Sequence, residues 1–243
     1  MSKKRKRQQT MTGLPLVDGL ESLPSPQLSD YTQAASEYIR AASGITKGQG
    51  KAAQIKLSKT LAMVGLRDLR QLGIALPDAV PGEHSVGGGL RAVQVDLSEN
   101  TRTDGLTLAF EIKPVHLAVG RAIWNRFGDI RSFAVNVHLK FPFAVLGGIM
   151  TVPTKEREAS GEDTAWKPTT HLISRAIDRF IRAGGRLTEG HAAHLLEAIA
   201  VLVFDHETGV VDASLPPVGS GLRWEEFIDA IAKTYRARFE EMS

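Results

Sequence analysis

Three residues in the segment Ala92–Lys113 have side chains whose types and spacing could carry out a reaction. Asp96 stands in a run rich in valine and leucine, and Glu111 and Lys113 are two positions apart in a second apolar run. Two carboxylates can bind a hard divalent cation such as Mg²⁺, and an ammonium group beside them can orient or deprotonate a water molecule. These residue types therefore predict metal-assisted hydrolysis of a phosphodiester bond.

The two runs are joined across Asp104-Gly105, a dipeptide that favours the tight type I′ turn of a β-hairpin. If these two residues form the loop, Asp96 lies opposite Lys113 and Ser98 lies opposite Glu111. Asp96, Glu111 and Lys113 then share one face of the hairpin. Opposed Cβ atoms on neighbouring strands are about 5 Å apart, so both carboxylates could reach one cation.

Asp104 is the alternative first carboxylate, because it also precedes Glu111 and is followed by a glycine. On one extended strand, however, the seven residues from Asp104 to Glu111 span about 23 Å, which is too far to share a metal ion. Residues 106–110 contain no turn-forming residue that would shorten this path. The spacing therefore favours Asp96 and leaves Asp104 as the alternate. A simpler interpretation of Glu111 and Lys113 is a charge pair on a solvated strand face.

The segment Phe110–Lys113, followed by Gly120-Arg121-Ala122 and Asn125-Arg126, resembles the PD-(D/E)XK nuclease superfamily, and within it restriction endonucleases of the XhoI kind. The resemblance covers roughly residues 50–153. It departs from the family pattern in one place, because Val95 stands where the leading proline of the motif is expected before Asp96.

This resemblance implies a restriction-endonuclease-like core and Mg²⁺-dependent cleavage of double-stranded DNA, most often by a homodimer of a type II restriction enzyme. Such families often add an acidic residue from an early helix to the metal site, for which Glu37 is the candidate; its simpler interpretation is a solvent-facing side chain. Two other functions stay open: a repair, nicking or structure-selective nuclease, and a DNA-binding protein without catalysis.

The segment Ala118–Val137 has the pattern of an amphipathic helix, with Arg121 and Asn125 on its polar side. These two residues could contact the DNA backbone or a second subunit. Arg126 falls in the apolar arc, where an unpaired guanidinium is costly. It is therefore expected to find a carboxylate or a phosphate, or to lie at the open end of the arc. The simpler interpretation is pairing with a hairpin carboxylate; the functional one is contact with the scissile phosphate or ordering of the metal carboxylates. Lys51 follows a glycine-rich turn that lacks the spacing of a phosphate loop, so no nucleotide cofactor is expected, although Lys51 could contact a phosphate backbone.

The elements that must position these residues follow from hydrophobic periodicity. Helices are expected over 28–42, 51–72, 118–137, 172–181 and 224–239, and strands over 90–97, 106–115, 143–152 and 199–204. Residues 77–89 read as a long loop, and residues 1–27 as a disordered basic tail and irregular lead-in. The expected fold is α/β (α+β): a mixed central β-sheet flanked by helices, in one domain over 28–243 with a core at 50–153 and a helical C-terminal part at 164–243.

Composition limits the classes of function. The chain has 243 residues, no cysteine and a net charge of +3. The lack of cysteine excludes disulfides and thiolate metal sites and favours the cytoplasm. No run of apolar residues is long enough to span a membrane. Because Lys3, Lys4, Arg5, Lys6 and Arg7 supply five of the positive charges, any phosphate-binding surface on the rest of the chain must be local.

Overall fold

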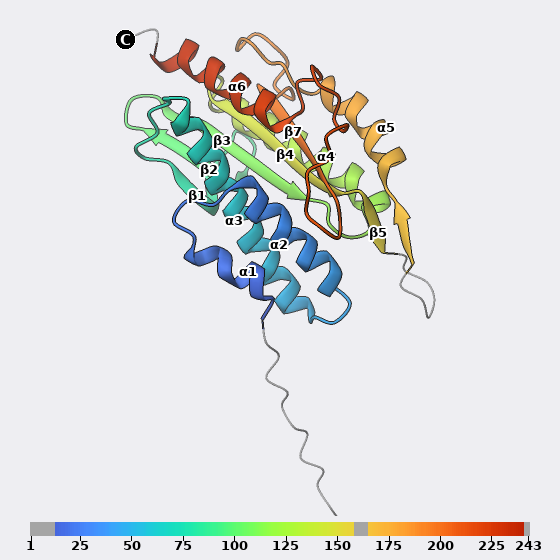
Figure 1. Cartoon of the computed structure of the whole chain (residues 1–243). Coiled ribbons are helices and arrows are strands. Elements are labelled where there is room, and N and C mark those ends of the chain that lie inside the picture. The colour runs from blue at the N-terminus through green and yellow to red at the C-terminus, as the bar shows by residue number, and fades with distance from the viewer. Residues whose placement is uncertain (1–12, 158–164, 241–243) are drawn as a thin grey trace, which may run out of the picture.

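The computed structural model describes residues 13–157 and 165–240 and contains a five-stranded mixed sheet in the order β1-β2-β3-β4-β7 (Figure 1). Strands β1 (Val80–Gly87), β2 (Ala92–Thr101) and β3 (Gly105–Pro114) are antiparallel neighbours. Strands β4 (Val145–Pro153) and β7 (Ala198–Phe204) continue the sheet parallel to β3. A separate two-stranded sheet joins β5 (Lys155–Arg157) and β6 (Trp166–Pro168).

Helices cover both faces of the sheet, which gives three layers. One face carries α1 (Pro15–Gly19), the short 3-10 turn η1 (Leu20–Ser22), α2 (Leu28–Ala41), α3 (Lys47–Gln71) and α6 (Trp224–Tyr235), which continues into η2 (Arg236–Glu240). The other face carries α4 (Val119–His138) and α5 (Thr170–Ile181). This arrangement confirms the mixed α/β fold expected from the sequence. No helix in the described ranges is long and apolar enough to cross a membrane.

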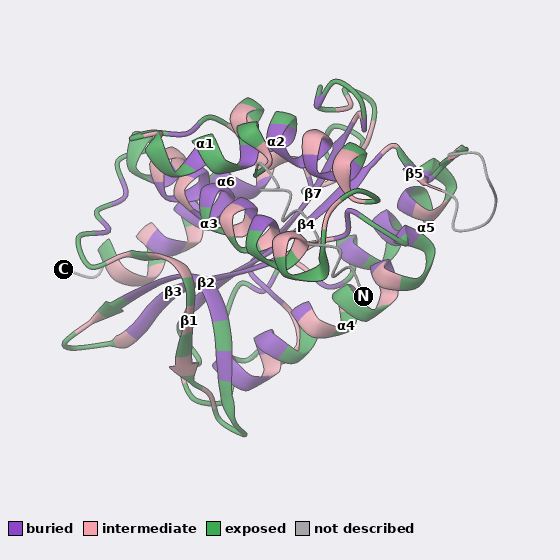
Figure 2. Ribbon diagram, turned by 90° about the horizontal axis from the view of Figure 1, so that it is seen from below, coloured by how far each residue is buried: buried purple, intermediate pink, exposed green. Residues whose placement is uncertain are grey.

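Two hydrophobic cores lie on opposite faces of the sheet because side chains alternate along its strands. Phe110 and Ile112 of β3 point into the core under α3 and α6, whereas Ala109 points into the core under α4 and α5. Strands β4 and β7 are buried along their whole length, as parallel strands covered on both faces must be. Figure 2 shows this contrast: the centre of the sheet is buried, while β1 at the edge is partly exposed.

The central strand β4 contains two glycines that permit close packing of its neighbours. A Cβ atom on Gly147 would lie 2.6 Å from Phe110, and one on Gly148 would lie 2.7 Å from Ile130 of α4. Gly148 is also the register partner of Glu111 on β3. The missing side chain therefore lets α4 approach the sheet beside Glu111.

Two predictions for the N-terminal part of the chain were wrong. Helix α3 begins at Lys47 instead of Lys51, because Thr46 caps it: the Thr46 hydroxyl accepts the Gln49 N–H and the Gln49 side chain accepts the Thr46 N–H. Residues 13–27 are not an irregular lead-in, since α1 and η1 pack Val17 and Leu20 into the core. The remainder of the predicted tail, residues 1–12, lies outside the described residues.

The predicted loop over residues 77–89 is instead largely the edge strand β1. Pro81 and the glycines pointed to a loop, but an edge strand tolerates proline, since no further strand needs its N–H. The pairing of β1 with β2 shifts register between Pro81 and His84, which is where a bulge absorbs the irregular residues.

The hairpin of β2 and β3 forms as predicted, but its register differs by two residues. Leu97 lies opposite Phe110 and Ser98 opposite Ala109, and a further shift occurs between Glu99 and Asn100. The loop is longer than the predicted two residues, because Thr101 pairs with Gly105 and closes it. Since side chains alternate with a period of two, a shift of two leaves the predicted face of each residue unchanged.

Candidate active site at a fork in the sheet

The candidate site lies where β2 separates from β3. The two strands are paired only from the turn to Leu97 and Phe110; beyond that point β2 pairs with β1, and β3 continues beside β4. Asp96 is the first residue past the last pair, and its Oδ2 accepts the main-chain N–H of Ile112 at 2.7 Å. A carboxylate thus takes the place of the strand-to-strand hydrogen bond that is lost at the fork.

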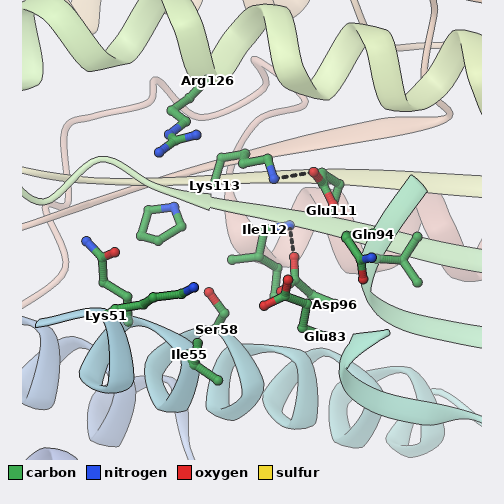
Figure 3. A pocket seen from close by; sticks show the side chains of 13 residues that line it. Lys51, Ile55, Ser58, Glu83, Gln94, Asp96, Glu111, Ile112, Lys113 and Arg126 are labelled. Atoms are coloured by element: carbon green, nitrogen blue, oxygen red, sulfur yellow. Dashed lines mark hydrogen bonds and ion pairs between the residues drawn. The ribbon is translucent and has the colours of Figure 1, made fainter. Parts of the chain in front are cut away.

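Glu111 and Lys113 project from β3 at the same fork. The Lys113 ammonium forms an ion pair with Oε1 of Glu111 (Figure 3). The Glu111 side chain is 7% exposed and that of Lys113 is 22% exposed, so the pair is largely shielded from water. Asp96 is also buried, with 8% exposure. The three residues predicted to act together therefore lie together.

A pocket of about 220 Å³ opens at the fork between α3 and α4. Its lining comes from α3, β1, β2, β3 and α4: Lys51, Gln54, Ile55, Ser58, Glu83, Gln94, Val95, Asp96, Glu111, Ile112, Lys113, Pro114 and Arg126. Acidic groups lie at the sheet, and Lys51 and Arg126 approach from the two helices (Figure 3). The pocket therefore brings acidic and cationic side chains together.

Burial raises the pKa of both sheet carboxyls. The pKa of Asp96 rises from 3.8 to about 6; burial is the main cause, and the Ile112 hydrogen bond and the Lys113 charge oppose it. The pKa of Glu111 rises from 4.5 to about 7, again mainly through burial, with Lys113 opposing the shift and Asp96 adding to it. Two buried acids whose charges repel each other are stabilised by an additional cation.

The chemistry of these donors fits Mg²⁺ better than a fully protein-enclosed metal. Within residues 13–157 and 165–240 no group of three or more His, Cys, Asp or Glu side chains is placed to hold a metal ion. Asp96 and Glu111 offer carboxylate oxygens only, and Mg²⁺ in proteins is commonly held by one or two carboxylates together with waters and substrate phosphates. The pocket could supply the two carboxylates and leave room for the other ligands.

Arg126 and Lys51 both line the pocket, and Arg126 takes one of the positions expected for it, the open end of the apolar arc. Its guanidinium pairs with Asp129 on α4 at 2.9 Å instead of with a hairpin carboxylate, and its side chain is 48% exposed. Arg126 therefore lies at the open edge of the apolar arc. Lys51 reaches the pocket from the second turn of α3 (Figure 3).

Four other candidate residues lie outside the pocket lining. Glu37 accepts the main-chain N–H of Leu16 and so ties α2 to α1. Asp104 lies in the hairpin turn, where it accepts the Thr101 and Thr103 hydroxyls, and it does not share the site with Glu111. Arg121 and Asn125 are exposed on α4. Of the two alternatives, Asp96 lines the pocket with Glu111 and Asp104 does not.

Glu83 and Gln94 also line the pocket, although neither was predicted from the sequence. Glu83 lies on β1, and Figure 3 shows its carboxylate beside Asp96, whose pKa it helps to raise. It was missed because its strand was read as a loop. Gln94 precedes Asp96 by two residues on β2, and this i, i+2 spacing on a predicted strand was a signal that could have placed it near the site.

Comparisons of the chain with protein-family models, with curated proteins and with solved structures gave no match.

Proposed function

We propose that this protein is a metal-dependent endonuclease that hydrolyses phosphodiester bonds of double-stranded DNA. The observation that carries the proposal is the meeting of Asp96, Glu111 and Lys113 in one pocket, with both carboxyls buried and their pKa values raised. Strongly shifted acids in a cleft are typical of functional sites, because burying them without a partner destabilises the fold.

The same burial argues against the solvated strand face as an explanation of Glu111 and Lys113. A charged strand face in contact with water needs no burial of its carboxylates, whereas Asp96 and Glu111 are 8% and 5% exposed. Stability alone is a weak explanation of the Glu111–Lys113 pair, since replacing a buried ion pair by apolar residues is often neutral or stabilising. A chemical role gives the buried acids a reason to be present.

Each residue has a distinct role in the proposed reaction. Asp96 and Glu111 would hold Mg²⁺, which when bound polarises the phosphate and lowers the pKa of a bound water. Lys113 lies beside Glu111 and would orient the attacking water and offset the negative charge that develops on the phosphate. Arg126 and Lys51 lie at the rim from opposite helices and would contact phosphate oxygens.

The choice of DNA and of a restriction-type enzyme rests on the resemblance of Phe110–Lys113 and the following helix to PD-(D/E)XK nucleases. The chain order around the site agrees with this choice: a helix, three antiparallel strands, a crossover helix and a parallel strand, with the acids on the second and third strands. In keeping with that resemblance, we propose a cytoplasmic homodimer that binds duplex DNA.

The test is digestion of a fully sequenced supercoiled plasmid by the purified chain, with Mg²⁺ and with EDTA, followed by sequencing of the ends. We expect cleavage only with Mg²⁺. The variant Glu111→Gln keeps the size of the side chain and removes its charge, so it should abolish cleavage and leave DNA binding largely intact. Discrete bands with a common end sequence support a restriction enzyme; nicks alone or a random smear support another nuclease.

The matched control is Glu99→Gln. Glu99 is another buried acid on the same hairpin, but it accepts the Asp78 N–H and does not line the pocket. The control should therefore cleave like the unmodified chain. Equal cleavage by Glu111→Gln and the unmodified chain, or cleavage that persists in EDTA, would refute the proposal.

A further inference from the structure

A second pocket, distinct from the fork, lies between α4 and α5 and is lined by cationic and aromatic residues. Its volume is about 370 Å³, and its lining consists of Phe127, Arg131, Arg179, Arg182, Ala183 and His194. None of these is an acid. Within residues 13–157 and 165–240, none of the three arginines forms an ion pair with a carboxylate. Three uncompensated guanidinium groups around one hollow indicate a site for an anion.

Aromatic rings hold two of these arginines in place. The Arg179 guanidinium carbon lies 4.3 Å from the centre of the Trp124 ring, and that of Arg131 lies 5.8 Å from the centre of the Phe127 ring. Phe127 in turn contacts Phe180 edge to face at 4.8 Å between ring centres. A guanidinium stacked on a ring keeps its N–H groups free at its edge, where they can bind a phosphate. The pocket is thus preorganised before any ligand arrives.

Basic residues continue beyond the pocket along α5. His171, Arg175, Arg179 and Arg182 are spaced by four, four and three residues, and all four are exposed. This spacing puts them on one side of the helix over a length of about 16 Å. The only acid on the helix is Asp178, and Arg182 donates to its main-chain oxygen. An extended row of three arginines and a histidine matches a chain of phosphates better than a single compact anion.

We propose that Arg131, Arg179 and Arg182, with the exposed side of α5, bind the phosphate backbone of duplex DNA at a distance from the cleavage site. The inference deepens the proposed function and rests on it for the choice of ligand. Successive phosphates on one strand rise by about 3.4 Å along the duplex axis, so the stripe could follow roughly five nucleotides. Contacts of this kind fix the position of a protein on the duplex and carry no direct sequence information.

The experiment measures the affinity of the full-length chain for a labelled duplex by fluorescence anisotropy, in EDTA, over a series of salt concentrations. Each lost phosphate contact lowers the slope of log affinity against log salt by about 0.9. The double variant Arg179→Gln with Arg182→Gln should therefore reduce the magnitude of the slope by about 1.8. The double variant to lysine keeps both charges and should retain the slope.

The matched control removes two exposed cations that lie on neither α4 nor α5: Arg102 in the hairpin turn and Lys233 on α6, each replaced by glutamine. Its slope should equal that of the unmodified chain. The inference is overturned if the two glutamine double variants behave alike, or if the lysine variant loses as much slope as the glutamine variant. It is also overturned if the α5 variant loses binding of inorganic triphosphate while its slope for the duplex is unchanged.

This readout is independent of cleavage, because no metal is present. A chain that binds duplex DNA with the expected slope but never cleaves it would refute the nuclease and retain the α5 surface. Cleavage that depends on Glu111, together with an unchanged slope in the α5 variant, would support the nuclease and refute the α5 surface.

Discussion

The raised pKa of Glu111 should lower the free energy of unfolding at high pH, and Glu111→Gln should remove this loss. A carboxyl whose pKa is higher in the folded chain than in the unfolded chain stabilises the fold below its unfolded pKa. That contribution disappears as the pH rises through the folded pKa. With values of 4.5 unfolded and about 7 folded, the loss between pH 5 and pH 8 is roughly 2.5 kcal/mol. The cause is the cost of holding a buried charge at high pH.

The assay is urea unfolding of the metal-free protein at both pH values. The unmodified chain should lose stability as the pH rises, and Glu111→Gln should lose about 2.5 kcal/mol less over the same interval. The difference in free energy of unfolding between the variant and the unmodified chain should therefore change in favour of the variant from pH 5 to pH 8. The control Glu225→Gln removes an acid whose side chain is 68% exposed, where water screens its interactions, and should leave the pH dependence unchanged. If Glu111→Gln and the unmodified chain show parallel pH profiles, the argument from burial is wrong.

Three further results are expected. Mg²⁺ should raise the thermal unfolding temperature of the unmodified chain more at pH 8 than at pH 5.5, because the raised pKa values of both carboxyls mean that the ion must displace protons at lower pH. Glu197→Gln should lower the free energy of unfolding by about 3–5 kcal/mol in urea, because the fully buried Glu197 pairs with Arg186 and Arg238 and their charges would be left uncompensated. Gly148→Ala should lower it by about 1–3 kcal/mol, since the added Cβ would lie 2.7 Å from Ile130.

Each of these results has a comparison that can contradict it. Equal Mg²⁺ stabilisation at both pH values, or stabilisation that survives Glu111→Gln, would show that the ion does not bind the pocket acids. For the buried cluster the comparison is Asp129→Asn, which breaks a half-exposed pair with Arg126 and should cost no more than about 1 kcal/mol. For Gly148 the comparison is Gly128→Ala, where the added Cβ meets nothing within 4 Å; an equal loss in both variants would contradict the packing argument.

Much of the fold could be predicted because the spacing of apolar residues along the sequence indicates which side chains are buried. The strands β3, β4 and β7 lie within a few residues of their predicted bounds, since their runs of β-branched and apolar residues are buried on both faces. The edge strand β1 was missed because one side of an edge strand needs no partner, so prolines and glycines persist there. The start of α3 was missed because a capping box was read as a turn.

The three central residues of the site could be predicted because they lie on the two strands of one hairpin. Side chains alternate between the two faces of each strand, so the sequence indicates that all three lie on the same face. Their exact pairing could not, because the longer turn and the bulge at Glu99 depend on packing around the hairpin. The partner of Arg126 was also missed. The helical pattern indicated which side of α4 carries Arg126 but not how deeply its side chain is buried, and the side chain pairs with Asp129 of the same helix. Glu83 reached the pocket through β1, which the sequence did not reveal as a strand.

The hydrogen bond from the Ile112 N–H to Asp96 implies that the structural role of this side chain does not depend on its negative charge. One oxygen of the side chain closes the gap between two diverging strands, and an amide oxygen would do this as well as a carboxylate oxygen. Asparagine here would therefore preserve the architecture while removing a negative charge. Under the proposed function, this one substitution would remove hydrolysis and leave a scaffold that still binds DNA.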